Sequence, residues 1–140
     1  MAIYSLVLRR KPGQKLFEYN KQRLDFLTRS NSLARRWKIS VWAFRLFQES
    51  AHFVVMGTTS QIGQFQRLLQ SGHGVWRFHQ GDLLEWLPSK RVLIGDLKKG
   101  LNEVDRLHSV DGLVAPWSSL RDYSALRGCP WFQPPMELEA

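Results

Sequence analysis

The order of short apolar runs and amphipathic segments is the feature that most restricts the fold of this chain. Residues 3–8 form an apolar run that is long enough for a strand and too short for a helix. An amphipathic segment follows over 20–37, with Asn20 as the expected helix cap, Leu24 on its apolar side and Gln22 on its solvent-facing side. Residues 38–47 and 52–56 are rich in β-branched and aromatic residues, and the short polar segment between them predicts a hairpin.

The second half of the chain continues this alternation. Residues 62–78 have helical spacing, although each of the glycines in this segment lowers helix propensity by up to about 1 kcal/mol. Residues 92–94 predict a short strand, and 96–107 predict a third helix capped by Asp96. The order β-α-β-β-α-β with an extra C-terminal helix predicts an α+β fold, a ferredoxin-like sandwich in which the first and third strands are central.

The chain has the size of one ordinary domain. Its 140 residues are 44% hydrophobic, which is enough apolar material for a core. We expect a single domain over 1–140, with a core over about 1–107 and a tail over 108–140. No apolar stretch approaches the roughly 20 residues that span a bilayer, and the single Cys129 excludes an internal disulfide. We therefore expect a cytoplasmic protein with no membrane partner.

Positive charge is concentrated in the first fifty residues. This segment carries eleven Lys or Arg against three acids, whereas the remaining ninety residues carry nine of each sign. An excess confined to one segment is typical of a surface that binds phosphates. Nucleic acid is therefore the partner that we favour, and the alternatives are a solvated basic face or an acidic protein partner.

The candidate phosphate contacts are basic residues grouped at the two ends of the first predicted helix, because such groups rarely serve packing. They are Arg9, Arg10, Lys11, Lys15, Arg35 and Arg36. Trp37 and Trp42 could stack on bases, but we favour core positions for both. Trp117 and Tyr123 are further candidates for contact with a hairpin end, although a role in seating the tail against the sheet is favoured.

Three segments of the sequence carry a family resemblance. They are IYSLVLRRKPGQKLF at 3–17, WKISVWAF at 37–44, and DGLV followed by PWSSLRDY within 111–123. In this order and spacing the chain resembles the bacterial IS200-like single-tyrosine transposases, and in particular their REP-associated branch, over nearly its whole length. The resemblance implies DNA transposition as the ancestral role, with binding of single-stranded or hairpin DNA and strand cutting through a covalent phosphotyrosine.

The same resemblance implies that the cutting chemistry of this chain is impaired or lost. The family holds a divalent metal, Mg²⁺ or Mn²⁺, with a His-hydrophobic-His pair on the third strand. The matching triplet here is Ser50-Ala51-His52, in which a serine, a poor neutral ligand, replaces one histidine. The family's tyrosine nucleophile aligns with His73, and Arg77, one turn later, has no lone pair to donate. On this alignment no catalytic set is intact, and we expect the metal not to be retained.

Three interpretations follow from the sequence. We favour a DNA-binding protein derived from such a transposase. The second interpretation is an active transposase that uses His73 as an altered nucleophile, and the third is a basic protein-interaction module. On the alignment His52 and His73 face each other and could still hold a metal with Glu49, but we favour packed or hydrogen-bonded histidines. Whether two copies form a homodimer is left open.

Overall fold

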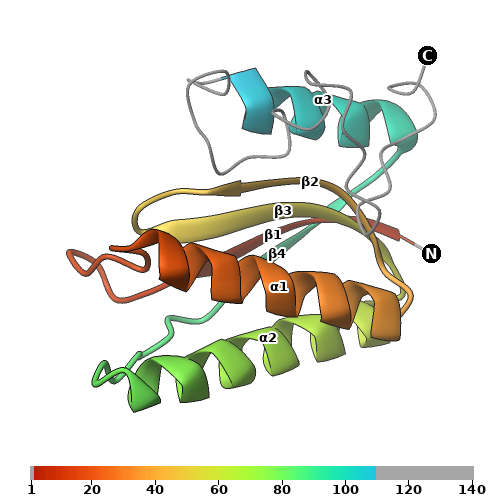
Figure 1. Cartoon of the computed structure of the whole chain (residues 1–140). Helices are drawn as coiled ribbons and strands as arrows, with labels where there is room; N and C mark the ends of the chain where they lie inside the picture. Colours follow the sequence, from red (N-terminus) through yellow and green to blue (C-terminus); the bar gives the residue numbers. More distant parts are fainter. Residues whose placement is uncertain (1, 110–140) are drawn as a thin grey trace.

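The strands of the protein form one antiparallel sheet with helices on both of its faces (Figure 1). The computed structural model describes residues 2–109. The elements are β1 (Ala2–Arg9), α1 (Asn20–Arg36), β2 (Ser40–Leu46), β3 (Ser50–Gly57), α2 (Thr59–His79), β4 (Lys90–Ile94) and α3 (Leu97–Ser109). The strand order is β2-β3-β1-β4, which confirms the ferredoxin-like topology with β1 and β3 at the centre.

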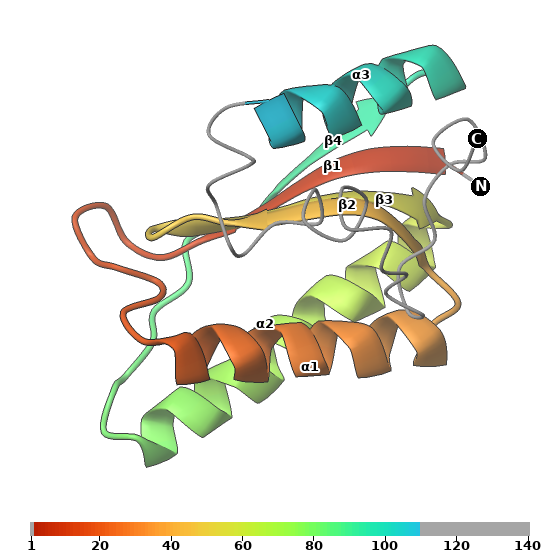
Figure 2. The same ribbon diagram turned by 45° about the horizontal axis from the view of Figure 1, so that its top comes forward.

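The helices divide into two layers that lie on opposite sides of the sheet. Helices α1 and α2 lie side by side on one face, and α3 lies on the other (Figures 1 and 2). We call these faces the α1/α2 side and the α3 side. In the described part of the chain, no helix is long and apolar enough to cross a membrane.

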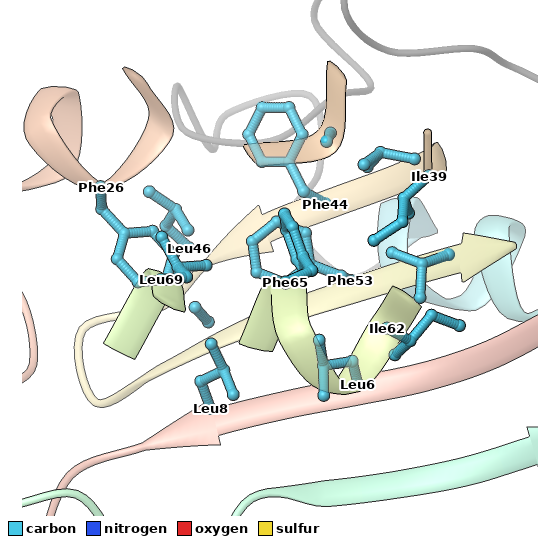
Figure 3. Packing of buried hydrophobic residues seen from close by; sticks show 14 of the residues in the cluster. Leu6, Leu8, Phe26, Ile39, Phe44, Leu46, Phe53, Ile62, Phe65 and Leu69 are labelled. Carbon is cyan, nitrogen blue, oxygen red and sulfur yellow. The ribbon is translucent and has the colours of Figure 1, made fainter. Parts of the chain in front are cut away.

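The larger part of the core lies on the α1/α2 side. Phe26 of α1 and Phe65 of α2 meet Phe53 of β3, with ring centroids about 6 Å apart in each pair (Figure 3). Aromatic rings at this separation add to the stabilisation from burial. A smaller cluster lies on the α3 side, where Trp42 is almost fully buried with Val54 and neighbouring strand residues. The core position favoured for Trp42 is confirmed.

Several of the predicted element boundaries differ from the structure, and β4, for example, begins at Lys90 and not at residue 92. Strand β3 begins at Ser50, so that the hairpin turn covers only 47–49. Helix α1 is capped at Tyr19 and not at Asn20. A side chain that looked polar and solvent-facing explains this start, because Gln22 Oε1 accepts hydrogen bonds from the backbone N–H groups of Glu18 (2.7 Å) and Tyr19 (3.3 Å). Gln22 is therefore buried, contrary to the sequence prediction.

Helix α2 is longer than predicted and runs through its glycines without a break. Its start was missed because it depends on a reciprocal pair of capping contacts. The Thr58 hydroxyl accepts from the backbone N–H of Gln61 (3.1 Å), and Gln61 Oε1 accepts from that of Thr58 (2.9 Å). The cap predicted for α3 is confirmed, because Asp96 Oδ1 accepts from the backbone N–H of Lys99 at 2.8 Å.

Two helical glycines are expected to respond to alanine with opposite sign. A methyl group at Gly100 would lie 2.9 Å from Trp42 Cζ3, so Gly100→Ala should lower the free energy of unfolding by about 1 kcal/mol through overpacking. At Gly74 the nearest atom, Trp86 Nε1, lies at an ordinary 3.6 Å, and Gly74→Ala should raise stability by up to about 1 kcal/mol. Urea unfolding of both variants measures this, and equal signs would contradict the packing of α3 on Trp42.

Candidate nucleic-acid interface

Ser50 and His52 lie on the same face of β3, as the alternation of the strand predicted. Their side chains are in contact, with Ser50 Oγ 2.9 Å from His52 Nε2. The face is the α3 side, because Val54, the next residue in the alternation, belongs to the cluster beneath α3. The positions of the family's metal ligands are thus brought together, with one serine and one histidine.

Basic residues surround this pair across the width of the sheet. Residues directly opposite one another in antiparallel strands share a face. One row across the four strands contains, from β2 to β4, Arg45, His52, Val7 and Lys90. In the next row, toward the end of the sheet, Arg9 is opposite Ser50. The α3 side therefore carries three strand cations around the Ser50–His52 pair.

Helix α3 brings a fourth cation to the same place. The helix begins over the apolar half of this face, where Gly100 packs against Trp42 and Ile3. Arg106, further along the helix, then comes close enough to His52 for its charge to act on the imidazole. Arg106 also pairs with Glu103 at 3.0 Å, and both residues line a hollow between α3 and the strand residues Ser5 and Val92. We call Arg9, Arg45, Lys90 and Arg106 the cationic patch.

Burial and the cationic patch keep His52 neutral. Burial, and after it the positive charges of Arg106 and Arg45, together lower the pKa of His52 to about 4. The Arg45 guanidinium stacks over Phe47 at 4.6 Å from the ring centroid, and Phe47 packs edge-on against His52. At neutral pH the imidazole is therefore uncharged in a strongly positive environment.

These residues do not fit a divalent metal. A serine hydroxyl is a poor ligand beside one imidazole, and several fixed cations repel a metal ion electrostatically. Among the side chains that the structure describes, Glu49 included, no three His, Cys, Asp or Glu residues lie in a group that could hold a metal. The donor set on the α3 side suits an anion in place of a cation.

His73 lies on the other side of the sheet from His52, and the expectation that the two histidines face each other is wrong. The His73 ring packs edge-on against Phe26 at 5.2 Å between centroids and has no exposed surface. The reason is the layering, because α2 covers the α1/α2 side whereas His52 points to the α3 side. The aligned nucleophile position therefore cannot reach the Ser50–His52 pair.

His73 belongs to a buried polar network that the sequence did not reveal. Its Nδ1 lies 2.9 Å from Asp25 Oδ2, which also accepts a hydrogen bond from Arg29 at 2.9 Å. Its Nε2 lies 3.3 Å from the Nη1 of Arg77, which is always a donor. This network assigns the proton to Nδ1. Burial lowers the pKa of His73 to about 4, although the hydrogen bond to Asp25 acts in the opposite direction.

Arg77 is fully buried and connects this network to the first loop. Its guanidinium donates to the carbonyl of Leu16 and to Asp82, and Arg10 forms a second, two-pronged contact with the same carboxylate at 2.9 and 3.2 Å. Burial acts to raise the pKa of Asp82, but the hydrogen bonds from Arg10 and Arg77 outweigh it and lower the pKa. Arg10, a candidate phosphate contact, is thus an ion-pair partner in this structure.

A cleft of about 740 Å³ opens beside this network, between the loop after β1 and the end of α2. Its lining residues include Arg10, Lys15, Glu18, Tyr19, Lys21, Trp76 and Asp82. Lys15 and Lys21 are exposed, Tyr19 is 64% exposed, and the ring of Trp76 stacks on His73. We call this hollow the loop cleft. The sequence pointed to Arg10 and Lys15 but not to Tyr19, Lys21 or Trp76. An aromatic residue close to a lysine was a signal for Tyr19 and Lys21, and Trp76 had none.

The remaining candidate contacts are distributed over separate surfaces. Lys11 is exposed in the same loop as Lys15, whereas Arg35 and Arg36 are exposed at the far end of α1. Seventeen helical residues separate the two groups by about 25 Å at 1.5 Å per residue. Arg36 stacks over Trp37, with 5.7 Å from its Cζ to the ring centroid. Trp117 and Tyr123 lie outside the described residues.

Tyrosines are absent from the α3 side in the described part of the chain. Tyr4 packs against the core of the α1/α2 side, and its hydroxyl lies 2.7 Å from Thr59 Oγ1. Tyr19 borders the loop cleft, and Tyr123 is outside the described residues. Helix α3, which faces His52, contains no tyrosine over Leu97–Ser109.

Comparisons with known proteins give a structural likeness. No family model matches the chain, and no curated protein matches it. Among solved structures, the fold is similar to that of a REP-associated tyrosine transposase bound to a REP hairpin, with a TM-score of 0.64 and 13% sequence identity. The match covers 96% of this chain and 86% of the other. The chain therefore has the fold of a REP-associated tyrosine transposase, as the resemblance of its motifs implied.

Proposed function

We propose that this protein binds single-stranded or hairpin DNA and does not cut it. The observation that carries the proposal is the loop cleft, where the exposed ammonium groups of Lys15 and Lys21 lie beside the exposed ring of Tyr19. Cations next to aromatic rings are the combination that binds backbone phosphates and stacks unpaired bases. The structurally similar transposase, which is bound to a REP hairpin, supports DNA as the partner.

The absence of cutting is part of the proposal. Strand cutting by the family's chemistry needs a nucleophile beside a metal-activated phosphate. The Ser50–His52 pair does not fit a metal, and the described tyrosines do not lie on the α3 side. A histidine nucleophile is also disfavoured, because His73 is fully buried and both of its ring nitrogens have hydrogen-bonding partners.

Binding of a labelled hairpin with a single-stranded flank is expected to weaken about a hundredfold between 50 and 200 mM salt. This factor corresponds to roughly four neutralised phosphates. The double substitution Lys15→Gln with Lys21→Gln should flatten the salt dependence and weaken binding at 50 mM salt by about tenfold. Arg67→Gln, which removes one positive charge from the exposed face of α2, is the control for Lys15→Gln and for Lys21→Gln when each is made singly.

The same experiment separates the three interpretations. Equal binding of poly-glutamate would favour the protein-interaction module, and failure to bind DNA at 50 mM salt would refute the proposal. With Mg²⁺ or Mn²⁺ present, the recovered DNA should remain intact on a denaturing gel. A protein-linked product that disappears in His73→Ala would establish the altered nucleophile.

A further inference from the structure

We propose that the cationic patch on the α3 side binds a phosphate group of the DNA directly, without a divalent metal. The inference deepens the proposed function, because it names the chemistry by which one face of the protein would hold the DNA backbone. It concerns a surface separate from the loop cleft, since the two lie on opposite sides of the sheet.

The patch has the dimensions of a phosphate site. Lys90 and His52 are separated by one intervening strand, and neighbouring strands lie about 4.8 Å apart, so their Cα atoms are about 10 Å apart. An anion above Val7, in the middle of this row, would have Lys90 on one side and the His52 imidazole on the other, with Arg9 on the same face two residues along β1. Arg106 approaches this face from α3, where it lines a hollow together with Ser5 of β1 and Val92 of β4.

The members of the patch differ in what they can contribute. Lys90 is exposed and the Arg106 side chain is 60% exposed, so both can contact a phosphate oxygen. Arg9 is half-buried beside Ser50, whose hydroxyl and the His52 imidazole add neutral polar groups. Arg45 is buried, and it contributes through its positive potential in a region of low dielectric.

In this site arginine and lysine side chains, in place of a metal ion, would neutralise the negative charge of the phosphate. A metal bound by two histidines neutralises a phosphate from one point, whereas guanidinium and ammonium groups neutralise it by charge-assisted hydrogen bonds from several directions. Such a site holds the backbone in position but provides no Lewis acid. It therefore fits a protein that binds DNA without cutting it.

The first test measures hairpin binding by the full chain in EDTA and in Mg²⁺ at matched ionic strength. We expect equal affinities in the two buffers. Lys90→Gln and Arg106→Gln should each weaken binding by about tenfold and reduce the salt slope by about one. Lys98→Gln, the same loss of charge on an exposed part of α3, should have little effect.

Glu103 provides a variant for which the two kinds of site predict opposite results. Its carboxylate pairs with Arg106, so at an anion site Glu103→Gln should strengthen DNA binding a few-fold by removing a competing negative charge. At a metal site a carboxylate would be a ligand, and the same substitution would weaken binding that depends on Mg²⁺. Stronger binding in Mg²⁺ that is lost in His52→Ala or Glu103→Gln would overturn the inference.

The second test needs no DNA. Inorganic phosphate added to the unliganded protein should shift the NMR resonances of the His52 ring, and Arg106→Gln should weaken this response whereas Lys98→Gln should not. If phosphate shifts His52 but DNA does not bind, a metal-free phosphate site at the patch is supported, whereas the proposed function and the assignment of that phosphate to DNA are refuted. If DNA binds but the patch variants behave like Lys98→Gln in both tests, the inference is wrong and the loop cleft alone carries the binding.

Discussion

Replacement of Arg77 by methionine is expected to lower the free energy of unfolding by about 3 kcal/mol. The methionine retains only the aliphatic part of the side chain and cannot donate to the Leu16 carbonyl, to His73 Nε2 or to Asp82. Removing one member of a buried ion pair typically costs 3–5 kcal/mol, because the remaining polar groups stay buried without their partners. Asp82 still pairs with Arg10 and is partly exposed, so the expected loss of unfolding free energy lies at the lower end of this range.

The control for this prediction lies on the same helix. Arg67 is exposed on α2 and donates only to Gln64 in the described contacts, so Arg67→Met should change the free energy of unfolding by less than about 0.5 kcal/mol. Chemical denaturation of both variants at pH 7 measures the difference. An effect of Arg77→Met no larger than that of Arg67→Met would contradict the buried network.

The fold could be predicted because its determinants are local in the sequence. Short apolar runs such as 3–8 and amphipathic segments such as 20–37 carry the periods of strand and helix, and a direct hairpin between two helices restricts the topology. Where local pattern misled, a tertiary contact was responsible. Gln22 is buried because it caps a helix, and Leu24, assigned to the apolar side of α1, is 54% exposed.

The candidate site could be predicted only in part, because its residues meet across layers. Alternation along one strand sufficed to place Ser50 and His52 on one face. The side of the sheet that α2 covers is a property of the whole topology. For this reason the sequence alignment predicted that His73 faces His52, whereas in the structure the sheet lies between them. Arg77 likewise looked like a lost metal ligand, whereas its actual partner Asp82 lies just beyond the helix.

Lowering the pH from about 6.5 toward 4 is expected to destabilise the protein, because the pKa values of its buried histidines lie below those of the unfolded chain. The pKa of His73 is about 4 in the folded protein and near 6.5 in the unfolded chain. Between these values the unfolded chain binds the proton and the folded protein does not, so stability is complete above about pH 6.5 and is lost as the pH falls toward 4. At about 1.4 kcal/mol per pKa unit, His73 accounts for a loss of about 3 kcal/mol.

His52 adds a further loss of the same sign, because its pKa is also lowered to about 4, but solvent reaches part of its ring and reduces the effect. The free energy of unfolding, measured by urea titration at several pH values from 7.5 to 4.5, should therefore fall steadily. His73→Gln keeps a neutral donor and acceptor at this position and should reduce the slope by about half. His79→Gln, at an exposed histidine of the same helix, should leave the slope unchanged. A flat profile in the unmodified protein, or an unchanged slope in His73→Gln, would show that His73 accepts a proton in the folded core as readily as in the unfolded chain.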